Sequence, residues 1–381
     1  MKRKKVIVLA RHKLIYVDTI LPVLHELNNN NNNIFTKIIV DDYALGYKKI
    51  KENIVINDIL SSIGEIILIQ GRSDYRTIRW IHALLVLFGI AWDGLRGGIL
   101  IHFGSANTYP FKLLRLFFQQ EKIYLSEAGI VNKVWKKIEN RFLDRPQEAH
   151  VENKYLDKVI CYSEWFYDHS NSRGEESFFY GPSRVTSAWI KYINDCQEKY
   201  LKKYHPDINH TDIVVTFFPT NLGQLPILNN TSTEFDLFVD VLDVFEKHFT
   251  DVVLMIKPHA VTNINLLVSE MNKRNIKHRI TYLHPTILIL RSSIVIASTP
   301  TNIFGDSKLI GTPTIEYSDL HKDILECTNG GSMAREYVDS FINKDKSKLI
   351  SDVDMYIKQK IIIHTCDYPG ASVLINNMLK L

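Results

Sequence analysis

Several features that would assign the chain to a common class of protein are scarce or missing. Its 381 residues include four widely spaced cysteines, none of them in a CxxC or CxxH pair. The usual signatures of a zinc site and of a disulfide framework are therefore absent, and a reducing compartment is the simpler expectation. The formal net charge is only +4. A dedicated nucleic-acid-binding protein would usually carry a larger basic excess, so no nucleic-acid partner is expected.

Long uninterrupted apolar runs are missing too. The basic amino terminus is followed by the short apolar run Val6–Ala10 and then by Arg11 and His12, which leaves no room for the core of a signal peptide. No apolar segment is expected to reach the ~18–20 residues that span a bilayer. We therefore expect a cytoplasmic protein that is soluble or attached peripherally to the inner membrane.

The chain does contain a regular alternation of short β-branched runs with helix-length segments. Hydrophobic residues make up 45% of it, enough for packed cores. Such alternation is typical of parallel sheets with helical crossovers, and it predicts an α/β fold with two doubly wound, Rossmann-like domains. The strands expected in the first half are Val6–Ala10, Thr36–Val40, Glu65–Ile69, Ile99–Phe103, Lys122–Leu125 and Val159–Tyr162.

Turn and helix signals set the expected domain boundaries. A helix predicted from Trp189 to Tyr204 ends at His205-Pro206, and a new strand is expected at Asp212–Phe218. Thr231 with Glu234 suggests a capping box at the start of the next helix. The predicted parts are an acceptor-binding domain (1–185), a linker helix (186–210), a nucleotide-sugar-binding domain (211–345) and C-terminal helices that pack back on the first domain (346–381).

Polar residues in the second half fall where strands are expected to end. Lys257-Pro258-His259 follows one strand, and Ser298, Thr299, Thr301 and Asn302 follow another. Ligands of open α/β sheets bind beyond the carboxyl ends of the strands, so both sets should face one crevice. A cation, a histidine, hydroxyls and a helix start all suit a phosphate group.

Three further positions in the second half bear on a nucleotide site. Glu316, at the end of the predicted strand Thr314–Glu316, could accept hydrogen bonds from a ribose, and Gly223 lies in the loop expected to approach the donor. His284-Pro285 is a rival His-Pro pair. We expect it to start the helix Thr286–Leu290, because proline favours the first helical position.

Basic and polar residues in the first half suit an anionic partner. Arg11 and His12 follow the first predicted strand, Arg72 follows the third, and Asn107 follows the fourth. Guanidinium groups match carboxylates bidentately, so these residues are candidates for the acceptor or for a sugar carboxylate.

The motifs together resemble those of bacterial GT-B glycosyltransferases that use CMP-activated sugars, namely sialyltransferases and capsular Kdo transferases. Lys257-Pro258-His259 is similar to their His-Pro motif, Leu290–Asn302 to their Ser/Thr motif, and Ser126–Gly129 to their acidic motif. The segment Phe217–Gln224 resembles the start of their nucleotide-binding domain. Ala260 stands where the family has a second proline, and Ala128 takes one of two acidic places.

The resemblance implies a GT-B fold with a cleft between the domains and a C-terminal helix that returns to the first domain. It implies transfer of a 2-keto sugar acid, such as sialic acid, another nonulosonic acid or Kdo, to a glycan or lipid-linked acceptor of a capsule or lipopolysaccharide. Glu127 would be the general base, and His259 would stabilise the departing phosphate. A single phosphate leaves, so we expect neither a metal ion nor another cofactor.

Other functions remain open at this point. A CDP-glycerol-type glycerophosphotransferase, a sugar-nucleotide epimerase or another GT-B enzyme would share the nucleotide cleft. A GT-B-like scaffold without catalysis is also compatible with the pair Glu127-Ala128. Should Glu127 not be the base, Asp74 and Asp93 are the next candidates in the first domain.

An apolar helix expected over Tyr75–Gly89, and the segment Phe111–Phe118, favour either core packing or a membrane surface. In the second segment Lys112 and Arg115 are interleaved with large apolar groups, as in monotopic surfaces that contact anionic lipids.

Overall fold

The computed structural model describes residues 4–10, 14–30, 34–40, 48–70, 75–103, 109–118, 122–125, 138, 157–259, 261–359 and 361–365. Contacts divide the chain into two compact units. Unit 1 holds the described residues up to Trp189 apart from Ile138, and unit 2 holds Ile138 and the described residues from Ile190 onward. The division falls inside helix α8 (Ser187–Tyr204), where the linker helix is predicted.

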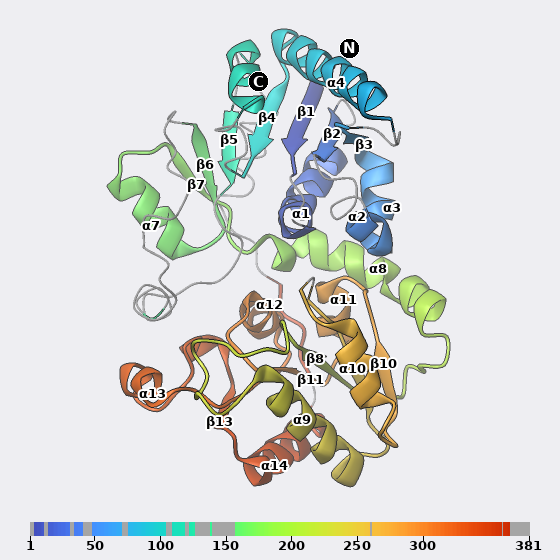
Figure 1. Cartoon of the computed structure of the whole chain (residues 1–381), viewed down its shortest axis with the longest axis vertical. Helices are drawn as coiled ribbons and strands as arrows, with labels where there is room; N and C mark the ends of the chain where they lie inside the picture. Colours follow the sequence, from blue (N-terminus) through green and yellow to red (C-terminus); the bar gives the residue numbers. More distant parts are fainter. Residues whose placement is uncertain are drawn as a thin grey trace. The chain divides into compact units, whose positions relative to one another are not determined.

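Unit 1 is built on a parallel sheet. Its seven described strands lie in the order β3-β2-β1-β4-β5-β6-β7, and every pair is parallel (Figure 1). The strands are β1 (Lys4–Leu9), β2 (Ile34–Val40), β3 (Gly64–Leu68), β4 (Ile99–His102), β5 (Lys122–Leu125), β6 (Lys158–Cys161) and β7 (Ser177–Phe179).

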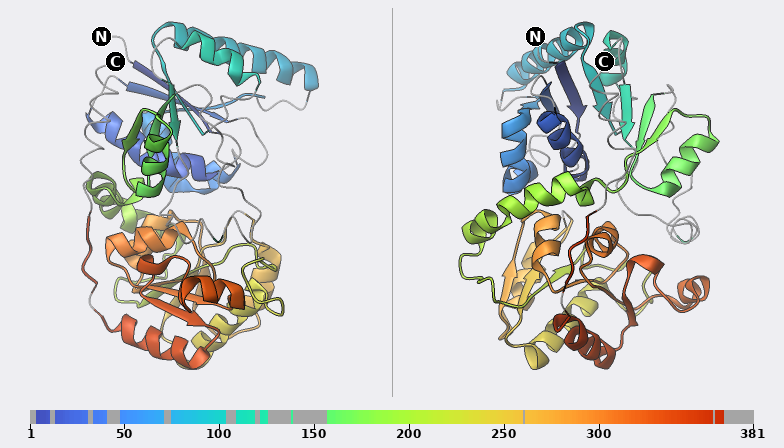
Figure 2. Two further views of the ribbon diagram at one scale, coloured as in Figure 1. Left: turned by 90° about the vertical axis from the view of Figure 1, so that its left-hand side faces the viewer. Right: turned by 180° about the vertical axis from the view of Figure 1, so that it is seen from behind.

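Helices lie on both faces of this sheet, with α4 on one side and α1 and α3 on the other (Figure 2). Ile7 and Leu9 of β1 share a core cluster with Ile90 and Ala91 of α4. The helices are α1 (Leu14–Asn30), α2 (Lys48–Glu52), α3 (Ile54–Ile63), α4 (Arg76–Leu95), α5 (Phe111–Leu114) and α7 (Glu164–Ser172), with 3₁₀ turns η3 (Arg115–Phe117) and η5 (Ser183–Val185).

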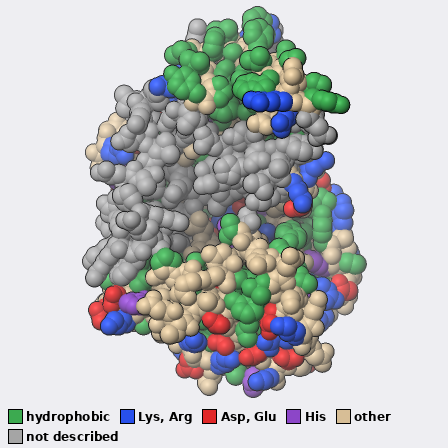
Figure 3. Space-filling view, viewed as in Figure 1, with side chains coloured by type: hydrophobic (Ala, Val, Ile, Leu, Met, Phe, Trp, Pro, Cys, Tyr) green, Lys and Arg blue, Asp and Glu red, His purple; other side chains and the backbone are tan. Residues whose placement is uncertain are grey.

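The outer face of α4 is apolar and exposed. Figure 3 shows hydrophobic side chains gathered over this helix, with lysine and arginine among them. We call this surface the α4 patch and define it by the exposed apolar side chains of α4, α5 and η3, chiefly Trp80, Leu84, Leu85, Phe88, Leu113 and Leu116, each more than half exposed.

By length and composition α4 is the one described helix that could cross a membrane. The expectation that no segment reaches that length was wrong. It counted uninterrupted apolar runs, whereas Arg76, Arg79 and His82 interrupt the run without ending the helix.

Unit 2 is also built on a parallel sheet. Its six described strands lie in the order β10-β9-β8-β11-β12-β13. Strands β8, β9, β11 and β12 are buried along their whole length, as expected for a sheet covered on both faces. The strands are β8 (Val214–Phe218), β9 (Val253–Ile256), β10 (His278–Ile280), β11 (Ile294–Ala297), β12 (Thr314–Ser318) and β13 (Ser340–Asn343).

Helices α9, α10 and α14 share one core cluster with side chains of this sheet, including Ile315 and Tyr317. Helix α9 starts with a capping box formed by Thr233 and Asp236. The predicted pair Thr231 and Glu234 was therefore wrong by two residues. The helices are α9 (Glu234–His248), α10 (Ile264–Met271), α11 (Pro285–Arg291), α12 (Asn302–Ile310), α13 (Lys322–Thr328) and α14 (Lys346–Ile357), with the 3₁₀ turn η6 (Arg335–Tyr337).

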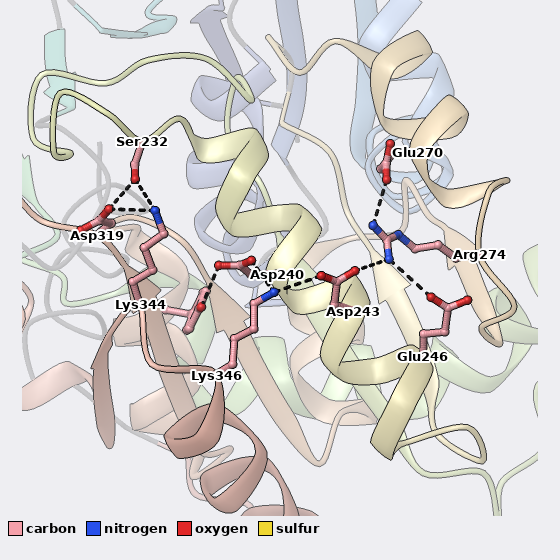
Figure 4. Close-up of polar contacts among 10 residues, drawn as sticks. Ser232, Asp240, Asp243, Glu246, Glu270, Arg274, Asp319, Lys344 and Lys346 are labelled. Carbon is pink, nitrogen blue, oxygen red and sulfur yellow. Dashed lines mark hydrogen bonds and ion pairs between the residues drawn. The ribbon is translucent and has the colours of Figure 1, made fainter.

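Ion pairs fasten the outer side of α9 to its neighbours (Figure 4). Lys346 of α14 reaches Asp240 at 2.7 Å and Asp243 at 3.0 Å. Arg274, which follows α10, pairs with Asp243 and with Glu246. These contacts hold α14 on unit 2, so the predicted return of residues 346–381 to the first domain was wrong for 346–357. Residues 366–381 lie outside the described part.

Candidate functional site

The topology of unit 2 points to one edge of its sheet. The chain builds from β8 outward to β9 and β10, then returns to place β11 on the other side of β8. Open α/β sheets bind ligands beyond the carboxyl ends of the strands where the order reverses in this way. The loop after β8 and the turn after β11 therefore define the candidate site.

A buried carboxylate joins these two segments. Glu234, the first residue of α9, is fully buried. It accepts hydrogen bonds from the backbone N–H groups of Thr220 at 2.7 Å and Leu222 at 2.9 Å, and also from the Thr220 hydroxyl. The Ser298 hydroxyl donates to it at 2.6 Å from the other side of the switch point. One carboxylate thus fixes both the β8–α9 loop and the β11–α12 turn.

The β8–α9 loop has an unusual backbone. Leu222 has a φ of 64°, a left-handed conformation that costs a branched residue free energy. The Asn221 side chain accepts from the N–H of Gly223 at 2.7 Å, and the Gly223 carbonyl accepts from the N–H of Glu234 at 3.0 Å. Gly223, predicted to bind the donor, therefore uses its own backbone groups to shape the loop.

The β11–α12 turn carries the predicted Ser/Thr motif. Ser298 is fully buried and Thr299 is nearly so, whereas Thr301 and Asn302 are half-buried. Thr301 caps α12 by accepting from the N–H of Ile303 at 3.4 Å. The amino end of a helix favours an anion, so this turn can hold a phosphate. Ser298, predicted to contact that phosphate, instead supports Glu234.

The Lys-Pro-His motif follows β9, the strand beside β8, as predicted. Lys257 is half-buried, and His259 is exposed, with its Nδ1 accepting from the N–H of Val261 at 3.4 Å. The hydroxyl of Thr262 donates to the carbonyl of Thr220, which ties this loop to the β8–α9 loop. Loops after three neighbouring strands are thus connected.

Glu316 lies inside β12 rather than at its end, because the strand continues to Ser318. It is fully buried, the Ser332 hydroxyl donates to its Oε2, and its Oε1 has no hydrogen-bond partner among the described residues. Burial raises its pKa to about 7. The predicted place at a strand end was wrong, and the Glu316 side chain offers no exposed atom to a ribose.

The rival pair His284-Pro285 starts a helix, as predicted. His284 is the N-cap of α11, its Nδ1 accepts from the N–H of Thr286 at 3.2 Å, and Pro285 is the first helical residue. The His284 ring is fully buried, whereas His259 is exposed.

The candidate residues of the first domain fall mostly outside the described residues. These are Arg11, His12, Arg72, Asp74, Asn107 and Glu127. The strand before Glu127, β5, has the predicted bounds. Asp93 is described and buried, and it pairs with Lys5 at 2.5 Å and with Lys37 at 2.7 Å. It fastens α4 to β1 and β2, so it is unsuited to be an alternative base.

Sequence reasoning missed a buried polar cluster in unit 1. At the end of β4, His102 Nε2 lies 2.8 Å from the Asp157 carboxylate, and Arg115 donates to the same carboxylate at 2.5 Å. Burial lowers the pKa of His102. Burial acts to raise the pKa of Asp157, but the bonds from His102 and Arg115 outweigh it and lower that pKa. The only available signal was a histidine at a strand end.

Among the described residues no three His, Cys, Asp or Glu side chains are grouped to hold a metal ion. Metal independence stays a prediction, because the acidic motif and the first-domain candidates lie outside the described part.

No protein-family model matches the chain, and no curated protein matches its sequence. Solved structures do match its fold. The UDP-GlcNAc 2-epimerase from Neisseria meningitidis, bound to UDP-GlcNAc, is 13% identical with a TM-score of 0.59, covering 99% of this chain and 100% of that chain. The fold is GT-B.

Two further structures are similar. S. aureus MnaA, solved with UDP, is 13% identical with a TM-score of 0.57, covering 98% of this chain and 96% of that chain. Another UDP-N-acetylglucosamine 2-epimerase is 10% identical with a TM-score of 0.56, covering 100% of this chain and 96% of that chain. At such identities the likeness concerns the GT-B fold, and the residues have to support the function.

Proposed function

We propose that the chain is a sugar-nucleotide-dependent GT-B enzyme that holds its nucleotide in unit 2, beyond the carboxyl ends of β8, β9 and β11. The observation that carries the proposal is Glu234. Its hydrogen bonds join two loops across the switch point. They therefore fix the position of the start of α12 relative to the β8–α9 loop before a ligand binds. Such preorganisation lowers the ordering cost of binding.

The reaction we propose is transfer of a 2-keto sugar acid from a CMP-sugar to a glycan acceptor. The amino end of α12, with Thr301 and Asn302, would hold the donor phosphate, and Lys257 would add a positive charge. His259 would stabilise the leaving phosphate, and Glu127 would remove the acceptor proton. The sugar–oxygen bond to CMP breaks, a bond to the acceptor oxygen forms, and CMP leaves.

A panel of nucleotides tests the donor. A ligand that binds the native state raises the apparent melting temperature, so CMP should raise it more than CDP, UDP or GDP at equal concentration. A CMP-sugar with a glycan acceptor should then release CMP. A rise in melting temperature with CDP alone would support the glycerophosphotransferase. A melting temperature that no nucleotide changes would contradict a nucleotide site and would favour the GT-B-like scaffold without catalysis.

A second candidate is a UDP-sugar 2-epimerase. It is supported by the fold likeness to two such epimerases over nearly the whole chain. Epimerisation changes the configuration of one sugar carbon and needs no glycan acceptor. Stabilisation by UDP, with conversion of UDP-GlcNAc in the absence of an acceptor, would favour this candidate and contradict CMP-sugar transfer.

A further inference from the structure

The α4 patch is an exposed apolar surface on a helix whose opposite face packs against the sheet of unit 1. The exposed residues Ile78, Ile81, Leu85, Phe88 and Trp92 recur at steps of three and four, which places them on one stripe of α4. Soluble proteins rarely expose a contiguous apolar stripe of this kind unless it binds something.

Contacts on the inner face keep α4 on the sheet. Asp93 is paired with Lys5 and Lys37, and Gly94 lies so close to η3 that an added Cβ would meet the Phe117 carbonyl oxygen at 3.0 Å. Ile90 and Ala91 belong to the core of unit 1. A helix held in this way can lie along a membrane surface but cannot cross the bilayer without leaving the sheet.

Within the two described segments that form the patch, 75–96 and 109–118, the exposed charges have one sign. Arg76, Arg79, Arg96 and Lys112 are exposed, whereas Asp93, the single acidic residue of 75–96 and 109–118, is buried. Arg96 lies over the Trp92 ring at 4.5 Å, and Lys112 lies 5.6 Å from the Tyr109 ring centre. Cations beside tryptophan and tyrosine suit the level of lipid headgroups, where an apolar ring and a charge are both satisfied.

An apolar groove runs between α4 and the α5–η3 segment. It has a volume of about 630 Å³, and its lining includes Leu85, Phe88, Leu113 and Phe117. That volume suits part of an acyl chain. Arg115, expected to contribute to a membrane surface, is instead buried against Asp157.

We propose that the α4 patch docks unit 1 on an anionic phospholipid bilayer, with α4 lying in the plane of the interface. The four exposed cations would contact headgroups, and the apolar stripe would enter the acyl boundary. A second copy of the chain is a poorer occupant. In a twofold dimer the patch would meet itself, and its cations would face cations with no exposed acid of these segments to pair with.

Vesicle flotation tests the proposal. The full chain should bind vesicles that contain about one third phosphatidylglycerol, and binding should fall between about 0.1 M and about 0.5 M salt. Pure phosphatidylcholine vesicles should bind it more weakly. Each arginine near an anionic surface strengthens binding about fivefold, so Arg76→Glu with Arg79→Glu should weaken it by about 25-fold or more.

A matched control makes the same change in charge elsewhere. Lys247 and Lys322 are exposed on unit 2, so Lys247→Glu with Lys322→Glu should leave vesicle binding unchanged. Equal loss in the control pair would overturn the proposal, because any cation would then serve. No binding to the anionic vesicles would also overturn it.

The apolar stripe is tested by Leu85→Ser with Phe88→Ser. Both side chains are exposed, so the fold should persist while vesicle binding is lost. Met355→Ser with Leu266→Ser, at exposed positions of unit 2, should retain binding. The patch would instead be assigned to a second copy if the original chain did not bind vesicles, formed a dimer in solution, and lost that dimer in the Leu85→Ser, Phe88→Ser variant.

Discussion

Glu234 shows how one buried side chain can organise a binding site. Its four hydrogen bonds come from two backbone N–H groups and two hydroxyls, on segments from opposite sides of the switch point. The sequence offered no way to see this. Glu234 lies where a capping acid is expected, but the cap uses Asp236, and that leaves the Glu234 side chain to reach back to the loops.

Replacing this carboxylate should lower stability and nucleotide affinity together. In Glu234→Gln, one amide N–H₂ group would face donors that need an acceptor, so the free energy of unfolding should fall by about 2–3 kcal/mol. Ser298→Ala removes one donor and should cost about 1–2 kcal/mol. Urea denaturation measures the free energy of unfolding of both variants, with the exposed Glu326→Gln as the control. A Ser298→Ala protein of unchanged stability that had lost nucleotide affinity would restore Ser298 as a phosphate contact.

Glu316 should make stability depend on pH. Its folded pKa is about 7 against an ordinary value of 4.5. Between these values the folded protein keeps a proton that the unfolded chain has lost, so the free energy of unfolding falls as the pH rises. The full loss is about 3 kcal/mol.

Glu316→Gln lacks this titration and should gain stability relative to the original chain as the pH rises from about 5 to about 8. Denaturation at both ends of that range, with Glu326→Gln as the control, measures the change. If the difference between Glu316→Gln and the original chain were the same at both pH values, Glu316 would not be the titrating group.

At the scale of elements, the loop after β9 carries the most direct test of chemistry. His259 is exposed, and the contact of its Nδ1 with the N–H of Val261 lies within its own loop, so His259→Ala should leave the fold intact. Turnover should fall about 10²–10⁴-fold if the ring assists the leaving phosphate. Glu127→Gln should transfer poorly yet bind CMP normally, since a base acts on the acceptor.

Turnover with a CMP-sugar and CMP affinity, measured separately, distinguish these roles. His248→Ala, at another exposed histidine of unit 2, is the control. A His259→Ala protein with an unchanged transfer rate would remove the Lys-Pro-His motif from the mechanism.

Elements with strong local signals were predictable. β5 and the start of α11 lie where the sequence predicts them, because strand-favouring residues such as Ile123 and Tyr124 and a proline at the first helical turn act locally. The short edge strands β7 and β13 were missed. The partners of Glu234, Ser298 and Arg115 could not be predicted either, because tertiary contacts across loops decide which polar atoms meet.

At the scale of the molecule, the described parts of the two units carry different surfaces. Unit 2 carries the loops proposed to hold the nucleotide, and unit 1 carries the α4 patch. A membrane-docked acceptor side and a soluble nucleotide side would suit an enzyme that joins a water-soluble donor to a lipid-linked glycan. The nucleotide panel and the vesicle assay test these two sides independently.

The ion pairs of Asp93 also bear on how the chain is made. Both of its partners, Lys5 and Lys37, belong to strands that precede α4 in the sequence. They have therefore left the ribosome before α4 is complete. Pairing the Asp93 carboxylate with these two cations favours packing of α4 on the sheet, because an unpaired carboxylate in the middle of a bilayer would cost free energy.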